Sequence, residues 1–336
     1  MNRISKLQLA ALLLIGDAFA IFCLHGRICA MTAVGFSSGS LIQLLLALPL
    51  ARAYDRGRTL ADCGTIVRLV LLTYVLVWGG ALFAMLREAS EVIYIPYERT
   101  GIFGQLAVAG LVALVCVYVS SSGIKALARS AVIAAGLGAV CVGIVVVSAG
   151  FQSDAGNLLR PTESSLWREL MRGFAASGNL GSFVVLLGFT ADDRTDTAAL
   201  YFTCKAVLSG VVLFTAVLVT GGIMDVLSFP VISAAQLSQP FPVQRTDSLF
   251  LVVFSVFAVY TAAVQASAAE YLIARTFPQL KRFRCTLALM ILAAAGAVMS
   301  APSQYTELYA AAALTALLIV PAEGLLKGGV RKRERT

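Results

Sequence analysis

The sequence predicts an all-α polytopic membrane protein, and its composition and the length of its apolar runs indicate this fold class. Of the 336 residues, 59% are hydrophobic and 13% are Asp, Glu, Lys or Arg. This charged share is about half that of a typical soluble domain. The apolar runs must close their backbone hydrogen bonds in lipid, and only a helix does so within one segment. A soluble enzyme is therefore excluded.

We expect ten transmembrane helices in one integral membrane domain over residues 1–336. Ten apolar runs have lengths suited to crossing a bilayer as a helix. They cover approximately residues 7–25, 32–51, 66–86, 102–121, 130–150, 173–190, 203–224, 248–273, 284–300 and 306–322. The first five runs form one repeat at about 7–150, the last five form a second at about 173–322, and a basic tail follows at 323–336.

The segments that join these runs place both termini on the same side of the membrane. Most of the 26 Lys and Arg residues fall in segments on that side, among them Arg52, Arg56, Arg194 and Lys205. Basic loops stay in the cytoplasm, so we expect cytoplasmic termini. Membrane topology thus explains the net charge of +8, and we expect the lipid bilayer, and no nucleic acid, as a partner. Two outward segments, 151–172 and 225–247, are each either an ordinary linker or the site of a short interfacial helix.

No motif of enzyme or metal chemistry occurs in the sequence. The seven cysteines are scattered without a CxxC pair, and His25 is the single histidine. We therefore expect no disulfide framework, no metal site and no cofactor. The phosphate-binding, zinc-protease and nucleophile-elbow motifs are absent too, so we expect no catalytic residue and no enzymatic activity.

Helix 1 carries an ionisable residue at mid-span. Asp17 directly follows Gly16 in LLLIGDAFAIF, and charged groups inside a membrane are functional candidates because they are costly to bury. A glycine followed by a short acceptor suggests a break in the helix that exposes backbone groups to a ligand. Alternatively, Asp17 only forms a bond to a neighbouring helix.

Helix 6 carries the densest cluster of helix-weakening residues, in FAASGNLGSFVVLLGF. The cluster contains Ser177, Gly178, Asn179, Gly181 and Ser182. Helices 1 and 6 are the first helices of the two halves, and weakened segments at corresponding positions point to a transporter-type binding site. The alternative is that these small residues permit close helix packing.

Two further helices supply polar residues. Glu88 lies beside Arg87 near the outer end of helix 3, where a solvated charge and a functional one are about equally favoured. In helix 8, Tyr260, Thr261 and Gln265 form a polar stripe. That stripe suits interhelical hydrogen bonds as well as ligand contact.

Three stretches of the chain resemble the B subunit of spore germinant receptors. The first is LSFPVISAAQLSQPFPVQRTDSLFLVVFSVFAVY, with Pro230, Arg245 and Asp247 in an outward loop before helix 8. The second is SSSGIKALARSAVI, which resembles the family's basic link between helices 4 and 5. The third is DAGNLLRP, which resembles its outward segment before helix 6.

This resemblance implies a fold of the amino acid/polyamine/organocation superfamily, a leucine-transporter-type fold with two inverted five-helix repeats and broken helices 1 and 6. It also implies a multi-pass protein of the spore inner membrane that binds a small nutrient, an amino acid, and acts with receptor A and C subunits. An active amino acid or amine permease is the alternative function, and a membrane scaffold with a vestigial pocket is a third. The expected ligand-binding residues are Gly16, Asp17, Phe19, Glu88, Ser177, Gly178, Asn179, Gly181 and Thr261.

The chain departs from the family in helix 6, where Asn179 stands at a position that often carries Glu. Asp17 in helix 1 is not expected of the family, and we hypothesise that it supplies that charge instead. In that hypothesis the amino group of the ligand lies near Asp17, and its carboxylate lies near the backbone amides around Gly178 and Gly181.

Overall fold

The computed structural model describes residues 4–57, 59–93, 110–116, 118–119, 122–151, 153–159, 165–176, 179–221, 223, 227–238, 247–279 and 306–333. Over these residues the regular structure is helical, apart from one isolated parallel bridge between Ile4 and Thr190. The helices are α1 (Lys6–Phe22), α2 (Ala30–Asp55), α3 (Thr65–Ile93), α5 (Ile124–Gly150), η1 (Ala155–Leu159), α6 (Leu166–Ala175), α7 (Leu180–Leu186), η2 (Leu187–Phe189), α8 (Arg194–Thr220), α9 (Pro230–Leu237), α10 (Asp247–Thr276) and α12 (Thr306–Arg333).

Five single helices among the described residues are long and apolar enough to cross a membrane: α2, α3, α5, α8 and α10. Together they match the predicted second, third, fifth, seventh and eighth spans. A sixth crossing is possible if α6 and the helix from Leu180 to Phe189 form one bent span. The predicted span at 284–300 lies outside the described residues, and most of the span at 102–121 does too, so the count of ten stays a prediction.

Helix α1 is the most buried long helix, and it packs against α5, α8 and α10. Its first turn is closed by a capping box, in which Ser5 accepts a hydrogen bond from the backbone of Gln8 and the Gln8 side chain accepts one from Ser5. The helix then continues without interruption from Lys6 to Phe22. The predicted break at Gly16 and Asp17 is therefore wrong. The polar side chain of Asp17 has partners on another helix, so the α1 backbone does not need to open.

The predicted break in helix 6 is confirmed. Helices α6 and α7 are separated by a short interruption, and their axes differ in direction by 47°. The broken span begins at Leu166, after the cap Ser165, rather than at residue 173. The end of the predicted outward segment 151–172 thus forms the first limb of the span. Ser177 and Gly178, which fall at the break, lie outside the described residues.

Glycines allow α2 and α6 to cross with their backbones nearly in contact. A Cβ atom at Gly173 of α6 would lie 2.6 Å from the Cα atom of Phe36, and one at Gly35 of α2 would lie 2.6 Å from the carbonyl carbon of Glu169. Close approach of this kind is what small residues permit between membrane helices. It fixes the first limb of the broken span against α2.

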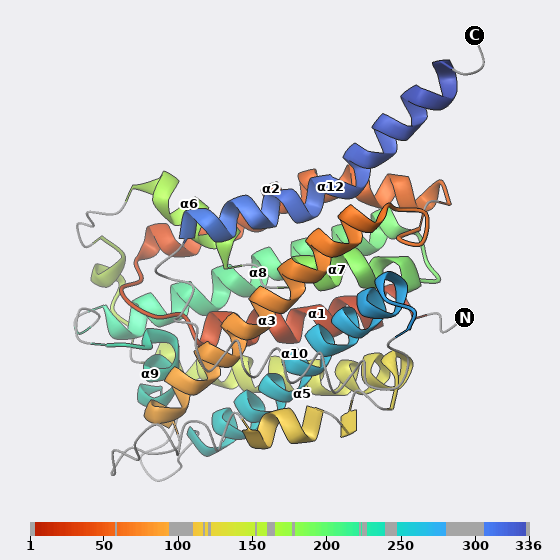
Figure 1. The fold of residues 1–336 in the computed structure, drawn as a ribbon. Coiled ribbons are helices and arrows are strands. Elements are labelled where there is room, and N and C mark those ends of the chain that lie inside the picture. The colour runs from red at the N-terminus through yellow and green to blue at the C-terminus, as the bar shows by residue number, and fades with distance from the viewer. Residues whose placement is uncertain are drawn as a thin grey trace.

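Figure 1 shows α1 inside the bundle and α12 along one side, with the last turns of α12 projecting beyond the other helices. The start of α1 and the end of α12 lie at the same end of the bundle, and α6 and α9 lie toward the opposite end. At the α1 end, the backbone amide of Ile4 donates to the carbonyl of Phe189, and the amide of Ala191 donates to the carbonyl of Ile4. The chain start is thereby fastened to the segment between α7 and α8. Which side of the membrane this end faces stays a prediction.

Candidate functional site

Asp17 of α1 forms a buried ion pair with Lys205 of α8. The Lys205 Nζ atom lies 3.2 Å from Asp17 Oδ1, and the side chains are 5% and 2% exposed, respectively. The hydroxyl of Tyr201, one turn before Lys205 on α8, donates a hydrogen bond to the other carboxylate oxygen, Oδ2. The two charges compensate each other in the interior of the bundle, where an uncompensated charge would be costly.

The position of Lys205 corrects the sequence-based topology count, which placed this residue in a cytoplasmic segment. Helix α8 begins at Arg194, so Lys205 lies three turns inside the helix rather than before it. Its charge therefore does not contribute to the positive-inside asymmetry. The remaining basic segments still favour cytoplasmic termini, which stays a prediction.

Gln43 of α2 connects the ion pair to the first limb of the broken span. Lys205 Nζ donates to Gln43 Oε1 at 3.2 Å, and Gln43 Nε2 donates to the backbone carbonyl of Phe174 at 3.1 Å. Phe174 lies in the last turn of α6, next to the break. A continuous chain of polar contacts thus runs from Asp17 on α1 to the end of α6.

Asn179 connects the other side of the break to α1 and α10. Its Nδ2 atom donates to the carbonyl of Leu13 at 2.9 Å, and its Oδ1 atom accepts from Gln265 Nε2 at 2.9 Å. Gln265 Oε1 in turn accepts from the Ser182 hydroxyl at 2.9 Å. All four residues are buried. The break is therefore held by side-chain amides from two helices and not by its own backbone alone.

The structure brings together three of the predicted site residues, Gly16, Asp17 and Asn179. A Cβ atom at Gly16 would collide with the Asn179 side chain, so the glycine makes room for the amide. Gly181, also on the predicted list, packs elsewhere: a Cβ atom there would lie 2.5 Å from Cδ1 of Tyr74 on α3. Its role in the fold is close packing between α7 and α3.

The other predicted residues lie in two places apart from the ion pair. Phe19 and Thr261 line one small apolar cavity, together with Leu82, Leu86 and Val112 among others. Glu88 is 30% exposed, and its carboxylate lies 3.8 Å from the guanidinium of the adjacent Arg87. Ser177 and Gly178 lie outside the described residues. A ligand contact for any of these residues stays a prediction.

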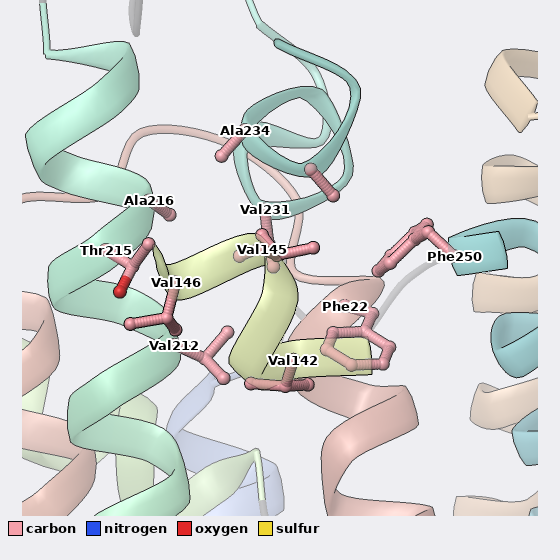
Figure 2. A pocket seen from close by; sticks show the side chains of 11 residues that line it. Phe22, Val142, Val145, Val146, Val212, Thr215, Ala216, Val231, Ala234 and Phe250 are labelled. Atoms are coloured by element: carbon pink, nitrogen blue, oxygen red, sulfur yellow. The ribbon is translucent and has the colours of Figure 1, made fainter. Parts of the chain in front are cut away.

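A second cavity lies between α1, α5, α8, α9 and α10, and Figure 2 shows its lining. Phe22 and Phe250 face it from one side, valines of α5 and α8 from the other, and α9 contributes Val231 and Ala234. The hydroxyl of Thr215 is the one side-chain oxygen among the residues drawn. This cavity suits an apolar group, and it contains none of the predicted site residues.

Sequence reasoning missed Lys205, Tyr201 and Gln43 as site residues. Tyr201 and Lys205 are one turn apart on α8, with the separation that places two side chains on one face of a helix. That spacing was the available signal, but it depended on starting the seventh span at Arg194. The polar stripe predicted in helix 8 contains Gln265, but the sequence does not indicate that its partner is Asn179.

Comparison with known proteins identifies the fold. No family model and no curated protein sequence matches the chain. The chain is similar to a substrate-bound, outward-open Na⁺-coupled sialic acid symporter, with 12% identity and a TM-score of 0.57 over 95% of this chain and 74% of that one. It is also similar to Mhp1 in its inward-facing conformation, with 16% identity and a TM-score of 0.52 over 94% of this chain and 76% of that one.

At these identities the likeness shows the fold alone. The predicted fold class, an all-α polytopic membrane protein with a leucine-transporter-type fold, is confirmed, except that α1 is continuous where the sequence predicts a break. The chain is therefore an integral, multi-pass membrane protein with a fold that is also found in transporters.

Proposed function

We propose that this chain binds a small solute at the break between α6 and α7 and changes conformation in response, without catalysing a reaction. The single observation that carries the proposal is Asn179. It stands at the break of a membrane helix, and its amide joins that break to α1 and α10 through Leu13 and Gln265. Interrupted helices at mid-membrane expose polar groups where a ligand can reach them, which is how transporter folds build their binding sites.

We propose an amino acid as the solute. Polar side chains of α1, α2, α8 and α10 converge on the break, and they include both an acidic and a basic group, Asp17 and Lys205. The hypothesis that Asp17 alone receives the ligand's amino group needs revision, because Lys205 already compensates that carboxylate. An amino acid brings one charge of each sign, so its entry leaves the net charge of the site unchanged.

The first candidate for the use of this binding is active transport, as an amino acid or amine permease. The fold likeness to a Na⁺-coupled symporter supports it. In a permease, ligand binding drives movement between outward-open and inward-open conformations.

The second candidate is nutrient sensing, as the B subunit of a spore germinant receptor in the spore inner membrane. The stretch from Leu227 to Tyr260, with Pro230 and Asp247, supports it by resemblance. Here ligand binding shifts a conformational population that the A and C subunits detect. Loss of nutrient-triggered germination on deletion of the gene, and co-purification with A and C subunits, are expected of this candidate alone.

Uptake by reconstituted protein tests the proposal. The full chain is placed in liposomes, and accumulation of a labelled mixture of the twenty amino acids is followed under a proton or a sodium gradient. Gradient-driven accumulation identifies a permease, whereas saturable binding without accumulation identifies a sensor. Absence of both rejects an amino acid ligand.

A matched pair of variants localises the site. Asn179→Ala and Asn157→Ala each remove an amide that donates to a backbone carbonyl, at 2.9 Å in both cases. Asn157 lies in η1, away from the break. Binding should be lost in Asn179→Ala and retained in Asn157→Ala, and equal losses would place the site elsewhere.

A further inference from the structure

We propose that the Asp17–Lys205 pair is a proton-binding site, in which the Asp17 carboxylate takes up and releases a proton beside the Lys205 ammonium. The inference rests on the proposed function for its role in ligand binding, but the proton site itself can be tested without a ligand. Ionisable groups inside membrane helices commonly mark ion pathways and proton relays.

The geometry distinguishes this pair from the ion pairs that only support the fold. Asp17 and Lys205 lie on different helices, α1 and α8, and both side chains are almost completely buried. Lys6 and Asp196, at 3.8 Å, are half or more exposed. A pair of this burial on two helices costs much desolvation free energy, and an apolar pair would hold the helices at least as well.

The groups that face Asp17 are compatible with both the charged and the protonated form of its carboxyl. They are Lys205 and Tyr201 from α8 and Tyr74 from α3, with the uncharged amide of Asn179, the residue before α7. Lys205 also faces the uncharged amide of Gln43 from α2. Tyr201 is a hydroxyl donor to the carboxylate, and a hydroxyl can also accept a bond from a protonated carboxyl by rotating its hydrogen.

A proton fits this place better than a metal ion does. Asp17 Oδ2 accepts a hydrogen bond from the Tyr201 hydroxyl, and Oδ1 lies 3.2 Å from the Lys205 ammonium, which already supplies a positive charge there. The two cavities described above are lined by neither Asp17 nor Lys205. A proton needs no additional volume, whereas a cation would have to displace the ammonium and repel it.

Charge balance connects the proton to the ligand. Protonation of Asp17 takes the pair from a net charge of zero to one positive charge, and a buried net charge is costly. An anionic group that enters with the proton, such as a ligand carboxylate, restores neutrality. Gln43 links the charge of the pair to the break, because its side chain forms hydrogen bonds with both Lys205 and the carbonyl of Phe174 at the end of α6.

Infrared difference spectroscopy on the full chain in lipid nanodiscs, in Na⁺-free buffer, tests the site directly. On lowering the pH from mildly alkaline to mildly acidic, we expect the C=O stretch of a protonated carboxyl to appear and to shift in D₂O. The band should vanish in Asp17→Asn. In Lys205→Met it should be present at both pH values, because a buried carboxylate without its cation takes up a proton.

Glu169→Gln is the matched control, because Glu169 is also a buried acid, with Arg172 at 3.7 Å on the same helix. The Asp17 band should survive in it. If Asp17→Asn does not fold, Tyr201→Phe replaces it and should move the pH midpoint of the band, since it removes the hydrogen bond to the carboxylate.

Two results would overturn the inference. One is the absence of any Asp17-dependent band over this pH range, which would make the pair a fixed structural contact. The other is an increase in thermal stability specific to NaCl over choline chloride that is lost in Asp17→Asn, which would make the site a sodium site. Neither result bears on solute binding at the break, which the uptake assay tests separately.

Discussion

The side-chain amide of Asn179 occupies the space beside Gly16 in which any other residue would place its Cβ atom. A Cβ at Gly16 would lie 2.9 Å from Asn179 Oδ1 and closer still to Nδ2. The amide cannot move away freely, because it bonds both the carbonyl of Leu13 and Gln265. Gly16 is therefore needed for contact between α1 and the break, and not for a break in α1 itself.

Gly16→Ala should destabilise the protein, because the new methyl group must displace the Asn179 amide from its two hydrogen bonds. Overpacking of this kind typically costs about 1–3 kcal/mol. The measurement is the thermal unfolding midpoint in detergent. The control is Gly143→Ala on α5, where a Cβ meets nothing within 4 Å; there we expect no loss, and equal effects of the two substitutions would contradict the interpretation.

The sequence predicted the fold class and the break in helix 6, because both depend on local composition. Long apolar runs require helices in lipid, and the cluster around Asn179 weakens one of them. The prediction of a break in helix 1 is wrong because it depends on contacts between residues that are distant in the sequence. Asp17 has a polar side chain that destabilises a helix in isolation, but its partners Tyr201 and Lys205 lie more than 180 residues away in the chain, and no local pattern reveals them.

The site itself was only partly predictable. Asp17 and Asn179 could be found because polar groups stand out in apolar spans. Lys205 was assigned to a loop, because its charge suited the topology and the start of the seventh span was placed too late. Gln43 gave no sequence signal, because a single amide in an apolar helix is typical of ordinary interhelical hydrogen bonds.

Removing one member of the Asp17–Lys205 pair should cost more stability than removing both. Lys205→Met leaves Asp17 buried without its cation, so the carboxyl must take up a proton that the unfolded chain does not bind at this pH, and breaking a buried pair in this way costs about 3–5 kcal/mol. The double variant Asp17→Asn/Lys205→Met leaves no charge and should recover most of that loss. Thermal unfolding of the two single variants and the double variant at near-neutral pH measures the coupling.

The exposed pair Lys6–Asp196 serves as the comparison for that cycle. Its atoms are 3.8 Å apart, and its side chains are 49% and 66% exposed, so Lys6→Met should change stability by no more than about 1 kcal/mol. Additive effects of the Asp17 and Lys205 substitutions would mean that the two charges do not interact in the folded protein.

Arg172 should hold the first limb of the broken span to the linker between α1 and α2. Its guanidinium donates to the carbonyls of His25, at 2.7 Å, and Arg27, at 2.9 Å. Arg172→Lys keeps the charge but cannot make both bonds with the same planar geometry. We expect faster hydrogen exchange in residues 25–28 of this variant, with unchanged exchange at the Arg68 contacts near the other end of the bundle. Uniformly faster exchange would indicate global destabilisation instead.

Cysteine accessibility should establish the membrane orientation that the basic residues predict. Thr59 lies between α2 and α3, and Ser153 follows α5; both are exposed. The positive-inside rule places Thr59 in the cytoplasm and Ser153 outside. In a Cys204→Ser background, because Cys204 is an exposed free thiol, a membrane-impermeant maleimide should label Ser153→Cys in intact cells and label Thr59→Cys only after permeabilisation. The reverse pattern would invert the topology and place α6 and α9 at the cytoplasmic end, so that the Arg172 contacts would close the inner side of the protein rather than the outer one.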